Sequence, residues 1–286
     1  MPQPFTLVEP DRRTTSVVFA SPHSGRDYPP EFLQASVLDP LTLRSSEDAY
    51  VDQLLDAAPQ AGAPLIVART PRAFVDLNRA PEELDPALIE GLRRTSHNPR
   101  VASGLGVIPR VVAGGRVIHR GKITLAEAHR RITQHWRPYH DRLQALLDRS
   151  RAEFGEAILV DMHSMPHEAL DAVRPAGSRR PEVVLGDRFG AAAAAEVVDR
   201  VEAAFRGAGF AVVRNAPFAG AYITQAYGRP SRRQHAVQIE IDRALYLDEA
   251  AVRPSADFAA FRDAMAGVVA AIAEIGRSRS LPVAAE

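Results

Sequence analysis

The sequence predicts an α/β protein built as a three-layer sandwich, with a parallel or mixed central sheet between layers of helices. Short apolar runs that are typical of buried strands alternate with longer amphipathic stretches that are typical of helices along most of the chain. One of these runs, residues 157–160, ends abruptly in the polar residues Asp161, His163 and Ser164. Buried strands of α/β proteins deliver functional side chains at their carboxyl ends. We therefore expect a single α/β domain over residues 1–286, organised around the strand that leads to His163.

Strands are expected where short apolar runs, most of them rich in valine or isoleucine, are bounded by glycine, proline or polar residues. They cover residues 16–20, 64–68, 157–160, 183–186, 210–213 and 236–241. The last strand differs from the others, because Gln238 and Glu240 alternate with apolar residues along it. A strand of this kind has one polar face and one apolar face. A hairpin is expected over residues 107–119, where two apolar runs flank Gly114 and Gly115.

Helices are expected where apolar residues recur every three or four positions. They cover residues 41–58, 124–154, 187–205 and 255–276. Pro59 ends the first helix, and Asp187 is a suitable N-cap for the third. Pro138 lies inside the second helix and should bend or divide it, because proline lacks the N–H that a helix interior needs. Short helix and loop are expected over residues 81–100, and the tail from Arg277 should fray.

Composition and charge narrow the class of protein. The chain has 286 residues, of which 46% are hydrophobic, and its 35 basic side chains balance 35 acidic ones. Because no block of lysine or arginine runs along the chain, nucleic acid is not an expected partner. The lack of cysteine excludes disulfides, thiolate metal ligands and a cysteine nucleophile. No stretch reads as a transmembrane helix or a signal peptide, so we expect a cytoplasmic protein without a membrane partner.

Two histidines occupy equivalent places at two strand ends. His23 and His163 each follow a buried strand, and each precedes a serine and a turn. Two histidines and one carboxylate with an open fourth position are the donors of a catalytic zinc site. Glu47 and Asp48 are neighbours on one expected helix, so only one of them should face the metal, and Asp48 is preferred. Asp161 shares a strand face with His163 and would orient its surroundings. The alternative is that both histidines bond loop backbones.

Glu240 and a polar loop supply the other candidate groups. Glu240 lies on a strand that is expected to be buried, where apolar surroundings would raise its pKa and suit it as a general base. The alternative is a strand face open to solvent. Asp76, Asn78 and Arg79 would form an anion-binding loop, because arginine offers a planar fork that matches a carboxylate. The alternative is an Asp–Arg pair that only pins the loop.

Seven segments, in order along residues 16–245, resemble the N-formylglutamate amidohydrolase family. They are Ser-Pro-His-Ser-Gly at 21–25, Glu-Asp-Ala-Tyr-Val-Asp at 47–52, Val-Asp-Leu-Asn-Arg at 75–79, Asp-Met-His-Ser-Met-Pro at 161–166, Leu-Gly-Asp-Arg-Phe-Gly at 185–190, Asn-Ala-Pro-Phe-Ala-Gly at 215–220 and Gln-Ile-Glu-Ile at 238–241. The resemblance implies a relation to the zinc carboxypeptidases and aspartoacylases. It also implies a phosphorylase/hydrolase-like fold, in which a mixed central sheet lies between helix layers.

Carried over by position, the resemblance implies one Zn²⁺ ion held by His23, Asp48 and His163, with Glu240 as the general base. One departure affects the ligand set. Zinc carboxypeptidases take their acidic ligand three residues after the first histidine, and this chain has Arg26 there. The acidic ligand must therefore come from elsewhere, and the choice between the two neighbouring acids at 47 and 48 stays open.

The resemblance also implies a reaction, the hydrolysis of N-formyl-L-glutamate to formate and L-glutamate in histidine degradation. Asn78 and Arg79 match the loop with which aspartoacylases bind the carboxylate of their substrate, and Arg72 or Arg214 would assist. The expected partner is therefore a small molecule that carries carboxylates. Two alternatives remain: hydrolysis of another N-acyl amino acid or small amide, and a non-catalytic small-molecule binding protein on the same scaffold.

Overall fold

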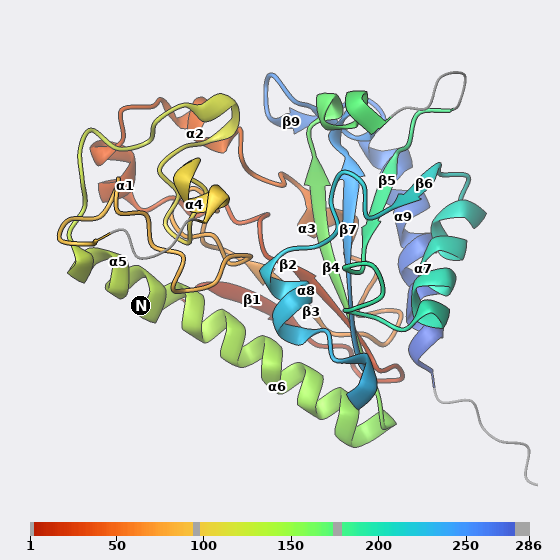
Figure 1. Ribbon diagram of the computed structural model, residues 1–286. Coiled ribbons are helices and arrows are strands. Elements are labelled where there is room, and N and C mark those ends of the chain that lie inside the picture. The colour runs from red at the N-terminus through yellow and green to blue at the C-terminus, as the bar shows by residue number, and fades with distance from the viewer. Residues whose placement is uncertain (1–2, 94–97, 174–178, 278–286) are drawn as a thin grey trace, which may run out of the picture.

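The computed structural model describes residues 3–93, 98–173 and 179–277, and its centre is a seven-stranded mixed sheet (Figure 1). The order of the strands across the sheet is β1-β3-β2-β4-β7-β5-β6. These strands cover Phe5–Val8 (β1), Val17–Ser21 (β2), Leu65–Ala68 (β3), Ala157–Met165 (β4), Val183–Gly186 (β5), Val212–Arg214 (β6) and Gln234–Asp242 (β7). A separate two-stranded sheet consists of β8 (Leu247–Asp248) and β9 (Arg253–Pro254).

Four neighbouring strands, β3, β2, β4 and β7, run parallel, so their carboxyl ends meet at one edge of the sheet. The outer strands make the sheet mixed. Strand β1 runs antiparallel to β3, while β5 and its parallel neighbour β6 run antiparallel to β7. Parallel neighbours need long crossover connections, which here carry helices. The predicted fold class, a three-layer α/β sandwich with a mixed central sheet, is confirmed.

Helices cover both faces of the sheet, and Figure 1 shows α6 along one face and α7 with α9 along the other. The first layer contains α6 (Arg137–Phe154) and α8 (Tyr222–Tyr227). The second contains α3 (Val51–Leu54), α7 (Ala195–Gly207) and α9 (Phe258–Ala273). Among the described residues, no helix is both long and apolar enough to cross a membrane.

Alternation along the strands divides the core into two faces. Phe19 and Val160 pack in the cluster with α7 and α9, whereas Leu159 packs in the cluster with α6. Because successive side chains of a strand point to opposite faces, His163 on β4 lies on the same face as Leu159. Glu240 stands opposite His163 in the register of β4 and β7 and therefore shares this face. The candidate site lies on the α6 side of the sheet.

The remaining helical segments are short. They are α1 (Pro30–Ala35), α2 (Pro40–Arg44), α4 (Pro99–Ala102), α5 (Leu125–Arg131), the π-helix η2 (Ile132–Trp136) and the 3₁₀ turns η1 (Ala113–Gly115), η3 (His167–Val173), η4 (Pro230–Arg232), η5 (Arg243–Leu245) and η6 (Glu274–Gly276). Short helix and loop were expected over 81–100; residues 81–93 form turns and loop, α4 begins only at Pro99 and runs to Ala102, and residues 94–97 are outside the described residues. The expected fraying beyond Arg277 also falls outside them.

The prediction of one helix over 41–58 is wrong, because the segment forms α2 and α3 with a turn between them. The turn is fixed by contacts that the sequence does not reveal. The backbone N–H of Asp48 donates to the carbonyl of His23 at 3.0 Å, so this N–H is not available for a hydrogen bond within a helix. Tyr50 then adopts a left-handed conformation with φ 64°, and α3 begins at the next residue. Asp48 therefore lies on a turn and not on a helix.

The long helix over 124–154 is divided, as Pro138 predicts, but the division begins ahead of the proline. Helix α5 passes into the π-helix η2, where the N–H of Arg137 donates to the carbonyl of Ile132, and α6 follows. Trp136, the last residue of η2, and His140, in the first turn of α6, are both buried.

Two further expectations are corrected by the structure. Helix α7 begins at Ala195, and Asp187 does not cap it, because its carboxylate instead accepts from Gly190 N and Asn215 Nδ2. The expected hairpin over 107–119 is reduced to a single antiparallel bridge between Val111 and Val117 around η1. The expected strands correspond to β2 to β7, but β4 continues through His163 to Met165, five residues beyond the expected end at 160.

Candidate metal centre and active site

Three predicted ligands converge at the carboxyl edge of the parallel strands. His23 follows β2, Asp48 lies in the turn before α3, and His163 is near the end of β4. All three are buried, and one ligand atom from each lies within 4.8 Å of the others. The Nδ1 of His163 is 2.9 Å from Asp48 Oδ2 and 3.1 Å from His23 Nδ1. The remaining edge, from His23 Nδ1 to Asp48 Oδ2, is 3.5 Å.

Close backbone packing holds His23 in this place. The turn after β2 reaches Gly25, and a Cβ atom there would lie 2.2 Å from the carbonyl oxygen of Thr70. Only glycine permits this approach to the end of β3. The carbonyl of His23 accepts the N–H of Asp48, so one backbone bond ties two of the ligand-bearing turns together.

Buried carboxylates lie beside both histidine rings, and the one beside His23 is hydrogen-bonded to its ring. Asp76 Oδ1 lies 2.7 Å from His23 Nε2, so this nitrogen carries the proton and Nδ1 turns its lone pair to the centre. Asp161 Oδ2 lies 3.0 Å from His163 Nε2 on the same strand face. A carboxylate behind a histidine is the usual support of a metal ligand, because it fixes the ring and its tautomer.

The electrostatics of the cluster favour a cation. Burial opposes a charged ring, yet Asp161 and Asp48 flank His163 and hold its pKa well above the ordinary value. Burial also opposes the charge on Asp48, but hydrogen bonds with His163 and His23 hold its pKa well below the ordinary range. The pKa of Asp76 is likewise lowered, because Arg72 and His23 outweigh the effect of burial.

The donor set fits zinc. Two imidazole nitrogens and one carboxylate oxygen are the ligands of catalytic zinc sites, and a tetrahedral site has edges of about 3.3 Å. The three edges of the cluster, 2.9, 3.1 and 3.5 Å, bracket that value. The carboxylate of the cluster belongs to Asp48 and not to Glu47. Glu47 Oε1 instead accepts from Tyr28 Oη at 2.7 Å and from Arg44 Nε at 3.1 Å, away from the histidines.

Glu240 stands beside the cluster, in register with His163 on the neighbouring strand. Its exposed fraction is 9%, so the alternative of a strand face open to solvent is wrong. Burial raises the pKa of Glu240 to about 7; His163 opposes this rise and Asp48 adds to it. Gln238 Nε2 donates to Glu240 Oε1 at 2.8 Å. The orientation of the Gln238 amide is fixed because Gln238 Oε1 accepts from the N–H of Ala221 at 3.0 Å.

The loop that links β3 to this site supplies Asp76 and three further candidates. Arg72 Nε donates to Asp76 Oδ2 at 3.0 Å, and the side chain of Arg72 is 24% exposed. Neither terminal nitrogen of Arg72 has a hydrogen-bond partner within the described part of the chain. Asn78 Oδ1 accepts from Ile223 N at 2.8 Å, while its Nδ2 faces His163 Nε2 at 3.2 Å.

Arg79 contributes mainly to the shape of this loop. Its Nε donates to the carbonyl of Leu105 and its Nη1 to the carbonyl of Asn78. Burial lowers the pKa of Arg79, although Asp76 partly offsets the effect. The predicted Asp–Arg pair exists, but it joins Asp76 to Arg72 and not to Arg79.

Arg214 is not brought to the site. It ends β6 in register with Leu185, which belongs to the core face that packs against α7. Its guanidinium pairs with Asp199 and Glu202 on that helix. Since the candidate site lies on the opposite face of the sheet, the expectation that Arg214 assists in substrate binding is corrected.

Two side chains that were not selected from the sequence form hydrogen bonds with the backbone of the loop that carries Asp76 and Asn78. Trp136 Nε1 donates to the carbonyl of Arg79 at 2.9 Å, and His140 Nε2 lies 2.9 Å from the carbonyl of Leu77. Burial lowers the pKa of His140 to about 3, so the ring is neutral. Its Nε2–H donates to Leu77, and its Nδ1 accepts from Tyr227 Oη at 2.8 Å. The sequence indicated only that Trp136 lies on the apolar face of the expected helix over 124–154, and it gave no signal for His140.

Gln238 and Arg243 were also not selected. The alternation of Gln238 with Glu240 on β7 was a usable signal, because residues two apart on a strand share a face. Arg243 follows β7 directly and donates from Nη2 to Asp48 Oδ1 at 2.9 Å. Nothing in its sequence surroundings distinguishes it from other arginines.

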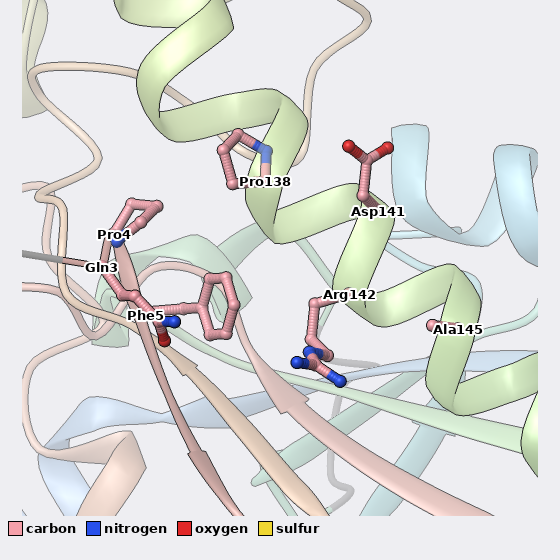
Figure 2. A pocket seen from close by; sticks show the side chains of 7 residues that line it. All are labelled: Gln3, Pro4, Phe5, Pro138, Asp141, Arg142 and Ala145. Atoms are coloured by element: carbon pink, nitrogen blue, oxygen red, sulfur yellow. The ribbon is translucent and has the colours of Figure 1, made fainter.

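A surface hollow of about 320 Å³ lies elsewhere, between β1 and α6 (Figure 2). Its walls are Gln3, Pro4, Phe5, Pro138, Asp141, Arg142 and Ala145, and none of the candidate site residues is among them. The predicted metal ligands and Glu240 lie at the carboxyl edge of the sheet and not in this hollow.

The mixed sheet, the buried histidine–aspartate cluster and the neighbouring glutamate together define a hydrolase. A family model for N-formylglutamate amidohydrolase matches residues 15–247. The chain therefore belongs to the N-formylglutamate amidohydrolase family, an enzyme family. The resemblance noted in the sequence is confirmed.

Individual relatives agree with this assignment. The chain is 31% identical over 247 residues to an N-formylglutamate deformylase of Pseudomonas aeruginosa, covering 84% of this chain and 85% of the relative. It is 32% identical over 209 residues to an N-formylglutamate deformylase of Pseudomonas putida, covering 71% of each. The crystal structure of an N-formylglutamate amidohydrolase from Ralstonia eutropha superposes with a TM-score of 0.88 at 36% identity, covering 96% of this chain and 98% of that one.

Proposed function

We propose that this enzyme hydrolyses N-formyl-L-glutamate to formate and L-glutamate, using one zinc ion held by His23, Asp48 and His163. The observation that carries the proposal is the buried three-ligand cluster with Glu240 directly beside it. The names of the relatives support the choice of substrate. A non-catalytic binding protein would have no use for a buried base beside a metal site.

The protein's own groups divide the work of the reaction. When bound, zinc supplies Lewis-acid polarisation of the formyl carbonyl and makes the attacking water more acidic. Glu240 accepts a proton from this water and later delivers it to the nitrogen of the leaving glutamate. Gln238 holds one oxygen of Glu240, which leaves Oε2 for the water. Asp76 keeps the ring of His23 in place during these steps, and Asp161 places a negative charge 3.0 Å from the ring of His163.

Arg72 is the arginine best suited to hold a substrate carboxylate. N-formylglutamate carries two carboxylates. Arg72 has a partly exposed side chain beside the cluster, and its terminal nitrogens have no hydrogen-bond partner among the described residues. Burial lowers its pKa, but Asp76 and Asp48 outweigh this effect and the net pKa is raised, so the guanidinium stays charged. Asn78 and Arg79 complete the substrate-binding loop, with Arg79 acting chiefly through the shape of the loop.

Arg72→Lys is expected to raise KM by about tenfold or more with a smaller change in kcat. Lysine keeps the charge but loses the planar fork that matches a carboxylate. Steady-state kinetics with N-formylglutamate measure the effect. Arg214→Lys is the matched control, because Arg214 is paired with α7 on the other face and should leave KM unchanged.

The same kinetics compare the two loop arginines. Arg79→Lys should lower the Tm as well as affinity for substrate, because its bonds to the carbonyls of Leu105 and Asn78 join parts of the loop. Equal KM values for wild type and Arg72→Lys would assign the carboxylate to Arg79 instead.

A substrate panel with metal analysis tests the function itself. Release of formate from N-formylglutamate should exceed release from N-formylaspartate, and N-acetylglutamate and C-terminal dipeptides should be poor substrates. Faster turnover of an N-acetyl compound would point to another N-acyl amino acid as the substrate. We place the reaction in histidine degradation in the cytoplasm, a location that cell fractionation checks.

A further inference from the structure

Arg243 is a buried cation that touches the metal cluster without belonging to it. It opens η5 directly after β7, and its side chain is only 7% exposed. Its Nη2 donates to Asp48 Oδ1 at 2.9 Å, and its Nε donates to Ser164 Oγ at 3.0 Å. Longer contacts reach the carbonyls of Ser164 at 3.4 Å and Ser45 at 3.3 Å. Every nitrogen of the guanidinium thus donates to a protein group.

We propose that Arg243 is a positioning residue that fixes Asp48 as a one-oxygen ligand and aligns the segments carrying Asp48 and His163. The inference rests on the zinc site proposed above and adds a determinant of its geometry and affinity.

The two oxygens of Asp48 have separate partners. Oδ1 accepts from Arg243, while Oδ2 faces His163 Nδ1 at 2.9 Å and His23 Nδ1 at 3.5 Å. A free carboxylate can rotate and offer both oxygens to a cation. The bond from Arg243 prevents this rotation, so Asp48 presents Oδ2 alone and leaves a coordination position for substrate or water.

The same guanidinium joins segments that are far apart in sequence. Its contacts with Ser45 and Asp48 fix the turn between α2 and α3, and its contacts with Ser164 fix the residue next to His163. A lysine at this place has no planar fork and cannot reach these acceptors in the same geometry. The shape of the arginine, more than its charge, therefore explains its position.

Charge and positioning predict opposite effects on zinc affinity. A guanidinium near the cluster repels a dication, so removing it should tighten zinc binding if charge is all that Arg243 contributes. If it positions Asp48, removing it should weaken binding, because the ligand is no longer held in place. Outer-sphere partners of metal ligands typically contribute 10- to 100-fold in affinity.

The test measures the dissociation constant of zinc by competition with a chromophoric chelator in wild type, Arg243→Met and Arg243→Lys. Both variants should bind zinc about 10- to 100-fold more weakly, and lysine should not rescue. Cobalt(II) in place of zinc gives a second readout. Its visible bands should weaken in both variants, because Asp48 then offers two oxygens and the coordination number rises.

Arg131→Met is the matched control. Arg131 is equally buried, at 7% exposure, and bonds one carboxylate and one backbone carbonyl, but outside the cluster. Its loss should lower the Tm and leave both the zinc affinity and the cobalt spectrum unchanged. Ser164→Ala removes one contact of the fork with little risk to folding, and should weaken zinc binding roughly 2- to 10-fold.

The outcomes separate this inference from the proposed function. Failure of the wild type to bind zinc at one ion per chain would reject the metal site itself. A wild type that binds zinc, together with variants at Arg243 and Ser164 that bind it equally or more tightly, would reject positioning alone. Rescue by lysine would show that a single ammonium donor can replace the planar fork and would overturn the inference.

Discussion

Replacing His163 with Ala is expected to remove zinc and hydrolysis together. The ring provides one of three ligand atoms that lie within 4.8 Å of one another, and two ligands hold zinc far more weakly than three. Loss of a Lewis acid costs several kcal/mol in the transition state, so kcat/KM should fall by about 10³-fold or more. Elemental analysis of the purified variant and formate release measure the two effects.

His235→Ala controls for the loss of a buried histidine. His235 is 4% exposed and accepts from the N–H of Ala194, away from the cluster. This variant should lose stability but keep its zinc. Full zinc content in His163→Ala would show that the ligand assignment is wrong, even if activity were lost.

The central strands could be predicted from sequence because they are buried on both faces. Strands β2, β4 and β7 are buried at every residue. Apolar runs reveal β2 and the first half of β4, whereas β7 shows apolar residues alternating with Gln238 and Glu240. Strand β1 was missed because it is a short edge strand with a mixed burial pattern. Helix α8 was missed because it has only six residues, and its N–H groups are positioned by tertiary contacts such as the bond from Ile223 to Asn78.

Some residues of the candidate site could also be predicted, because they are polar residues within strands that are otherwise apolar. Histidine and glutamate interrupting apolar runs, as at His163 and Glu240, are unusual enough to be noticed in one sequence. The choice of arginines was not predictable. Arg72 follows β3 and Arg214 ends β6, but β6 runs antiparallel to the central strands, and its register turns Arg214 to the other face. That register depends on pairing between strands that are distant in sequence.

Glu240→Gln is expected to lower kcat by about 10²-fold or more while zinc stays bound. Glutamine keeps the shape of the side chain but cannot accept the proton from water, and a positioned acid–base group typically contributes this much. Glu240 is not a ligand of the cluster, so the metal content should match the wild type. KM should change much less, because Arg72 and the cluster bind the substrate.

Glu47→Gln is the matched control for this change. Glu47 is also a buried glutamate, 2% exposed, but its carboxylate accepts from Tyr28 and Arg44 outside the cluster. A glutamine side chain retains an oxygen acceptor for one of these donors. The control variant should keep most of its kcat, although it loses some stability.

The pH profile tests the role of Glu240 independently of the size of the rate loss. A base must be deprotonated to act, so activity should rise with pH through the pKa of Glu240. Burial raises that pKa to about 7 in the ion-free protein, and a bound cation would lower it by favouring the carboxylate. The acidic limb of kcat/KM should therefore fall at or below about pH 7 and report the coupled ionisation of Glu240 and the attacking water. The limb should shift or vanish in Glu240→Gln. Near-normal turnover with an unchanged limb would reject Glu240 as the base and leave Asp161, which faces the same histidine, as the next carboxylate to test.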